Sequence, residues 1–115
     1  MIYNSDELYA NTEVLRIEVQ EAHGITILKL IGELDSYTSR QLISMSRGSA
    51  YGAKELLVDL DDLKYIDSAG LVALVSIWID FRDTGRRMVL SCQNNRVHRV
   101  LEITGLLSLF ELRHG

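Results

Sequence analysis

An apolar strand and a long apolar helix are joined by the segment Tyr65-Ile66-Asp67-Ser68-Ala69-Gly70-Leu71. The run before it, Leu56-Leu57-Val58-Asp59-Leu60, is nearly all apolar, as expected for a central strand covered on both faces. The apolar helical run after it begins near Gly70 and extends to about Thr84, where Gly85 is typical of the residue just past a helix end. The junction therefore predicts that Ser68 lies at the amino terminus of a helix.

A helix start gives Asp67 and Ser68 two possible roles. Either side chain can cap the helix by accepting hydrogen bonds from first-turn amides, and losing such a cap costs roughly 1 kcal/mol. The same unpaired amides and the positive end of the helix dipole stabilise an attached anion. We therefore predict that Ser68 can carry a charge switch, and capping and switching can coexist.

The rest of the pattern predicts an α/β fold. Strands are expected at 15–20 and 25–31, and His23-Gly24 between them predicts an antiparallel hairpin. A helix is expected from Thr38 to Arg47, a strand at 88–91, a helix opened by Asn94 or Asn95, and a final strand within 106–112. The order is β-β-α-β-α-β-α-β, and its long later connections predict parallel crossovers and a mixed sheet.

The composition is typical of one soluble globular domain of 115 residues, with 47% apolar and 24% charged residues. Residues 1–13 form a polar leader whose acidic start differs from a secretion signal, and the longest apolar run is too short to span a bilayer, so a cytoplasmic protein is expected. The net charge of −4 argues against direct nucleic-acid binding. The single Cys92 has no partner for a disulfide or metal site, so we expect no metal or cofactor and interpret it as a strand-end filler.

Several carboxylates would approach Ser68 if the loops after the strands share one end of the sheet. These are Asp35, either Asp59 or Asp61, and Asp67, although we interpret Asp61, like Asp62 and Glu33, as an ordinary surface or cap group. The segment 57–61 also resembles the Asp-x-Asp start of haloacid-dehalogenase-type phosphotransferases, but such enzymes need a positioned lysine, a further acidic pair for magnesium and a longer chain. We therefore expect a protein that is not an enzyme, and keep a small magnesium phosphotransferase as the weakest alternative.

Four motifs in fixed order resemble the STAS domain family, found in anti-sigma-factor antagonists and in the cytoplasmic tails of sulfate transporters. They are Ile31-Gly32-Glu33-Leu34-Asp35, Leu57-Val58-Asp59-Leu60, Ile66-Asp67-Ser68-Ala69-Gly70-Leu71 and Leu101-Glu102-Ile103-Thr104-Gly105-Leu106 with Phe110. The resemblance covers residues 14 to 112, which makes 14–115 a single STAS domain. It implies a four- or five-stranded sheet with helices mainly on one face.

The resemblance also implies a function, that of an anti-anti-sigma factor. In that family the antagonist binds an ATP-dependent serine kinase that is also the anti-sigma factor, and so frees the sigma factor for transcription. The kinase phosphorylates the serine of the Asp-Ser-x-Gly motif, here Ser68, and a phosphatase restores the active form. Asp35 and Asp67 would support this phosphorylation site, and Ala69, Gly70 and Leu71 would complete the segment that contacts the partner.

Two residues depart from the family pattern. Many members carry a second Ser or Thr after the phosphorylated serine and a Gly after the leucine, whereas this chain has Ala69 and Val72. Ala69 removes a rival acceptor, and Val72 alters how closely a partner can approach. The alternative within the family is an adaptor that is never phosphorylated, in an ABC-type lipid-transport or stress-signalling complex. Either role is compatible with a homodimer.

Overall fold

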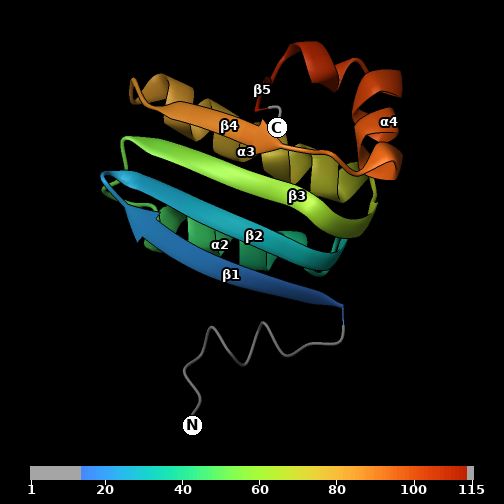
Figure 1. The fold of residues 1–115 in the computed structure, drawn as a ribbon, viewed down its shortest axis with the longest axis horizontal. Coiled ribbons are helices and arrows are strands. Elements are labelled where there is room, and N and C mark those ends of the chain that lie inside the picture. Colours follow the sequence, from blue (N-terminus) through green and yellow to red (C-terminus); the bar gives the residue numbers. More distant parts are fainter. Residues whose placement is uncertain (1–13, 114–115) are drawn as a thin grey trace, which may run out of the picture.

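The computed structural model describes residues 14–113, so the predicted leader at 1–13 lies outside the described residues. Within this range the chain forms a five-stranded sheet of order β1-β2-β3-β4-β5 (Figure 1). The predicted order of strands and helices is confirmed, with one short 3₁₀-helix, η1, added before the last strand. The elements are β1 (Leu15–Ala22), β2 (Ile25–Leu34), α2 (Ser39–Gly48), β3 (Glu55–Ile66), α3 (Ser68–Asp83), β4 (Arg87–Ser91), α4 (Asn95–Ile103), η1 (Leu106–Ser108) and β5 (Glu111–Arg113).

The opening hairpin forms as predicted, with β1 antiparallel to β2. His23 and Gly24 both have positive φ angles, 56° and 82°, which is the conformation of the two-residue turns that match the twist of paired strands. The strands from β2 to β5 are all parallel to one another. The mixed sheet expected from the connection lengths is therefore confirmed.

The third strand continues well beyond its predicted end at Leu60. β3 runs to Ile66, and its pairing with β2 shifts register between Lys29 and Ile31 and again between Gly32 and Glu33. Such irregularities break the strict alternation of buried and exposed residues. The sequence pattern failed here because the register shifts and the polar residues after Leu60 hide the strand period.

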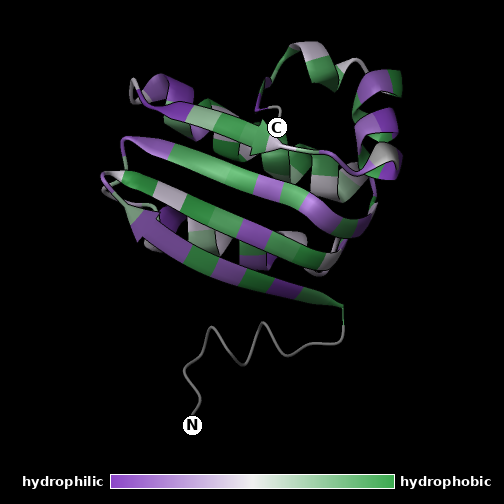
Figure 2. Cartoon of the chain, in the orientation of Figure 1, coloured by the Kyte–Doolittle hydropathy of each residue, from purple (hydrophilic) through white to green (hydrophobic). Residues whose placement is uncertain are grey.

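Two helices, α2 and α3, cover one face of the sheet, as Figure 1 shows, and this confirms the predicted layers. Figure 2 shows the alternation of hydrophobic and hydrophilic residues along β1 and β2 that places one side of each strand against these helices. Leu28, Leu30, Leu56 and Leu74 are completely buried in the core between the layers. Burial of apolar side chains such as these drives the packing of the helices on the sheet.

The third α-helix, α4, lies at the end of the sheet where β3 and β4 end (Figure 1). The Asn94 side chain caps it by accepting from the amides of Arg96 and Val97, while its own amide group donates to the Leu63 carbonyl of β3. Nearby Cys92 is buried, and burial raises the pKa of its thiol to about 11, which agrees with a packing role. None of the helices within residues 14–113 is long and apolar enough to cross a membrane.

Candidate functional site

The junction between β3 and α3 has a single side-chain cap, Asp67. Its backbone is extended (φ −114°, ψ −172°), and its Oδ1 accepts a hydrogen bond from the Gly70 amide at 3.0 Å. The Asp67 carbonyl accepts the Leu71 amide, also at 3.0 Å. The sequence left open whether Asp67 or Ser68 caps the helix, and in the structure Asp67 is the cap.

Ser68 is the first residue of α3, and its side chain is exposed. Its hydroxyl has no hydrogen-bond partner among residues 14–113, and within the same range the amides of Ser68 and Ala69 have no acceptor. An anion bound to this hydroxyl would meet unpaired donors at the positive end of the helix dipole. A modifying enzyme can reach the Ser68 oxygen without any part of the core opening.

Gly70 explains why α3 starts so close to the sheet. A Cβ atom at this position would lie 2.6 Å from the Leu34 carbonyl oxygen of β2 and 2.8 Å from Cγ1 of Ile66. The Asp67 amide donates to that same Leu34 carbonyl at 3.2 Å. The first turn of α3 therefore rests against the end of β2, and only glycine fits at the contact.

Asp35 follows Leu34 directly and holds the loop that leads into α2. Its Oδ1 accepts from the amides of Tyr37 and Thr38, both at 2.9 Å. Hydrogen bonds from Thr38, first of all from its backbone amide, hold the pKa of the Asp35 carboxyl below its usual value. Because the Leu34 carbonyl binds the Asp67 amide, the structure brings the Asp35 loop and the Ser68 junction together.

The remaining acidic candidates do not reach this site. Asp59 and Asp61 lie in the middle of β3, where Asp59 Oδ1 accepts the Asp61 amide at 2.9 Å and Asp61 Oδ1 accepts the Gln93 amide at 2.7 Å. Their approach to Ser68 depended on a strand that ends near Leu60, and β3 instead continues to Ile66, so both lie within the strand rather than in the loop after it. Asp35 and Asp67 are the two predicted carboxylates that lie at the junction.

Three exposed apolar side chains belong to the segments that meet at Ser68, and we call them the apolar rim. They are Tyr37 in the Asp35 loop, Tyr65 near the end of β3 and Val72 one turn into α3, with 69%, 48% and 64% of their surfaces exposed. Sequence reasoning singled out Val72 only as a departure from a family pattern and missed both tyrosines. Their exposure depends on packing, so no local signal could have identified them.

Comparison with known proteins places this geometry in a family. The chain matches the STAS domain over residues 16–114. It is 31% identical over 104 residues to the anti-sigma-B factor antagonist of Listeria monocytogenes, which covers 87% of this chain and 90% of that protein.

Two solved structures share the fold. An anti-sigma factor antagonist from Mycobacterium paratuberculosis matches with a TM-score of 0.77 at 22% identity, covering 90% of this chain and 89% of that one. The Bacillus cell fate determinant SpoIIAA in its phosphorylated form matches with a TM-score of 0.64 at 17% identity, covering 85% of this chain and 91% of that one. The chain belongs to the STAS domain family and is similar to the family's anti-sigma factor antagonists.

Proposed function

We propose that this protein is an anti-sigma factor antagonist that binds an anti-sigma serine kinase and is released when the kinase phosphorylates Ser68. The observation that carries the proposal is the exposed Ser68 hydroxyl at the start of α3, which makes no hydrogen bond within residues 14–113. Membership of the STAS family supports it, because the similar relative is an anti-sigma-B factor antagonist. The proposed role places the protein in the cytoplasm with its kinase.

The proposed complex forms when the apolar rim is buried against the kinase. Tyr37 and Val72 are more than half exposed in the free chain, so their contact with a partner removes apolar surface from water. Large exposed aromatic side chains also contribute strongly to interface energy where they are fully desolvated. The rim would thus provide affinity, while Ser68, which lies in the chain between Tyr65 and Val72, would provide control.

Phosphorylation at Ser68 would act through charge rather than through unfolding. A phosphoryl group adds about −1.5 to −2 charges, and in the free protein the amides at the start of α3 and the helix dipole offset that charge. In the complex the same anion would lose its water without a compensating partner, which costs several kcal/mol. Because about 1.4 kcal/mol is a tenfold change in affinity, one phosphate is enough to dissociate the complex.

Asp35 and Asp67 would serve this switch as positioning residues. Both carboxylates accept hydrogen bonds from backbone amides, and these bonds fix the Asp35 loop and the first turn of α3. The two negative charges also add repulsion to a phosphate on Ser68 in any state that excludes water. Their proposed role is therefore to hold the hydroxyl in place for the kinase and to sharpen the response to its modification.

The decisive experiment is phosphorylation by the cognate kinase with ATP, followed by mapping of the modified residue by mass spectrometry. The wild-type protein should gain one phosphate on Ser68, and Ser68→Ala should gain none. Ser36→Ala is the matched control, because Ser36 is an exposed serine in the neighbouring Asp35 loop. Phosphate that persists in Ser68→Ala, or disappears in Ser36→Ala, would contradict the assignment.

A binding titration tests the charge mechanism separately. Ser68→Ala should bind the kinase with nearly wild-type affinity, whereas Ser68→Glu and the phosphorylated protein should bind at least about tenfold more weakly. Treatment with a phosphatase should restore binding. Equal affinities for Ser68→Ala and Ser68→Glu would refute the mechanism, and co-purification with a membrane ATPase without any phosphorylation would favour an adaptor instead.

A further inference from the structure

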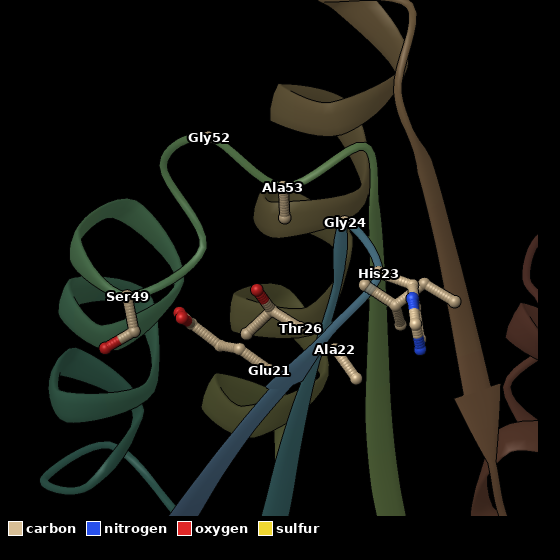
Figure 3. A pocket seen from close by; sticks show the side chains of 9 residues that line it. Glu21, Ala22, His23, Gly24, Thr26, Ser49, Gly52 and Ala53 are labelled. Carbon is tan, nitrogen blue, oxygen red and sulfur yellow. The ribbon is translucent and has the colours of Figure 1, made fainter.

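A concave site lies at the opposite end of the sheet from Ser68. It is a pocket of about 350 Å³ between the β1–β2 turn and the segment that follows α2. Figure 3 shows the Glu21 carboxylate extending from β1 towards Ser49, with the Thr26 hydroxyl beside it and Ala53 above. The parallel strands begin at this end, so the pocket is separate from the junction between β3 and α3 that carries Ser68.

Thr26 is the unusual residue of this pocket. Only 3% of its surface is exposed, yet its hydroxyl makes no hydrogen bond with any other residue in the range 14–113. Within residues 14–113 the fully buried side-chain oxygen without a partner is Gln41 Oε1, so the Thr26 oxygen is not sealed in the core but reached from the pocket that Thr26 lines. The hydroxyl is therefore free to bond to a molecule that enters the pocket.

The groups around Thr26 favour a positively charged ligand. Glu21 is the direct cross-strand neighbour of Thr26, so both side chains lie on the same face of the hairpin, and Glu21 has no ion-pair partner among residues 14–113. Ser49 directly follows α2, and a helix carries partial negative charge at this end. The cation in the last turn of α2, Arg47, pairs with Asp80 of α3. The pocket therefore offers acceptors and negative charge.

Three other ionisable side chains lie near this pocket, and none of them forms an ion pair with Glu21. The Arg86 guanidinium donates to the carbonyls of Ala50, Tyr51 and Ala53 in the segment after α2. The His23 side chain points away from Glu21 (Figure 3). The alkyl stem of Lys54 passes close to Gly24, but Lys54 does not line the pocket and forms no ion pair with Glu21.

We propose that this pocket binds an organic cation, a primary ammonium or guanidinium group. The Glu21 carboxylate would be its counter-ion. The Thr26 hydroxyl oxygen would accept a hydrogen bond from one of its N–H groups, since ammonium and guanidinium groups carry only donors. The cation can be a free small amine or a lysine or arginine side chain of another protein, because both present the same chemistry. This inference is independent of Ser68 and its proposed modification.

The test is a titration of the ¹⁵N-labelled full chain with n-butylammonium chloride, followed in amide NMR spectra. Ala22, Gly24, Ser49 and Gly52 line the pocket, so their amide signals should shift in a saturable manner. n-Butanol is the neutral control with the same carbon chain and should cause no such shifts. The absence of shifts with butylammonium, or equal shifts with n-butanol, would overturn the proposal.

A second arm distinguishes the two sources of the cation. N-acetyl-lysine N-methylamide presents the same butylammonium group on a peptide backbone. Tighter binding of this compound than of butylammonium supports a protein side chain as the ligand, and tighter binding of butylammonium supports a free amine. Both results support a cation site, whereas failure of both probes overturns it.

Variants of the chain test the two named groups. Glu21→Gln should weaken butylammonium binding by at least about tenfold, since it removes the counter-ion and keeps the shape. Glu18→Gln is the matched control, because Glu18 lies on the same strand, faces the other side of the sheet and pairs with Arg16. Equal weakening by both substitutions would indicate non-specific charge attraction and would overturn the proposal.

Thr26→Val separates a binding role from a structural one. This variant should weaken butylammonium binding and leave the melting temperature nearly unchanged, because the hydroxyl that it removes bonds to no other residue within 14–113. A structural role alone would lower the melting temperature and leave binding unchanged. That result would overturn the role of Thr26, and Glu21→Gln would remain as the separate test of the counter-ion.

Discussion

At the scale of single residues, adjacent Asp67 and Ser68 divide two tasks. Asp67 caps α3 through its bond to the Gly70 amide, which leaves the hydroxyl of Ser68 exposed and chemically free. Both residue types are good caps, so their order in the chain did not reveal which one would take the role. The extended backbone of Asp67 decides it, because only that geometry turns a side-chain oxygen onto the first turn of α3.

This division predicts a difference in stability between two neighbouring substitutions. Asp67→Ala should lower the free energy of unfolding by about 1 kcal/mol, as expected for loss of a cap. Ser68→Ala should change it by less than about 0.5 kcal/mol, because the Ser68 side chain is exposed. Urea unfolding of both variants measures the difference, and the reverse order would mean that Ser68 is the cap.

The lowered pKa of the Asp35 carboxyl predicts part of the pH dependence of stability. Its pKa is lower in the folded protein than the ordinary value of 3.8, so its contribution is fully present above that value and is lost as the pH falls through the folded pKa. Asp35→Asn keeps an oxygen that accepts the Tyr37 and Thr38 amides but cannot titrate in this range. Thermal melts from about pH 5 down to about pH 2 should show a steeper loss of stability in the wild-type protein than in Asp35→Asn. Parallel curves would show that the loop bonds do not depend on charge.

At the scale of elements, the contact between β2 and α3 fixes the site. The first turn of α3 approaches the Leu34 carbonyl so closely that Gly70 leaves no room for a side chain. The same contact holds the Asp35 loop beside the junction, because Asp35 immediately follows Leu34. A strand end and a helix start that are distant in the chain thus form one surface.

Two glycine substitutions test this contact. Gly70→Ala should lower the free energy of unfolding by about 1–3 kcal/mol, because the added methyl group collides with the Leu34 carbonyl oxygen as well as with the side chains of Ile66 and Leu34. Gly48→Ala is the matched control at the end of α2, where an added Cβ would meet nothing within 4 Å, and it should be stabilising by about 0.4–1 kcal/mol. Equal effects of the two substitutions in urea unfolding would mean that Gly70 of α3 does not lie against the Leu34 carbonyl of β2.

At the scale of the whole molecule, the two candidate sites lie at opposite ends of one sheet. Ser68 follows β3 at the carboxyl ends of the parallel strands, and the pocket of Glu21 and Thr26 lies at their amino ends. Between them is a core in which Leu28, Leu30 and Leu56 have no exposed surface. A core packed in this way does not deform easily, so a charge at one end is expected to act locally.

Amide NMR spectra of the phosphorylated and unphosphorylated protein test this locality. Shifts should be confined to residues 34–38 and 66–72, while Gly24 and Gly52 in the distant pocket keep their positions. Ser68→Glu should likewise leave butylammonium binding unchanged. Widespread shifts would contradict a local charge mechanism and would indicate a rearrangement of the sheet.

Local pattern alone was sufficient for the element order, the hairpin and the start of α3. These features depend on hydrophobic period, turn residues and helix caps, which act over a few positions along the chain. Packing between distant segments decided the length of β3, the placement of Asp59 and Asp61 within it, and the exposure of the Tyr37 and Tyr65 side chains. It also placed the unpartnered Thr26 hydroxyl beside Glu21. Register and exposure are properties of contacts between strands and helices, so they exist only once the chain has folded.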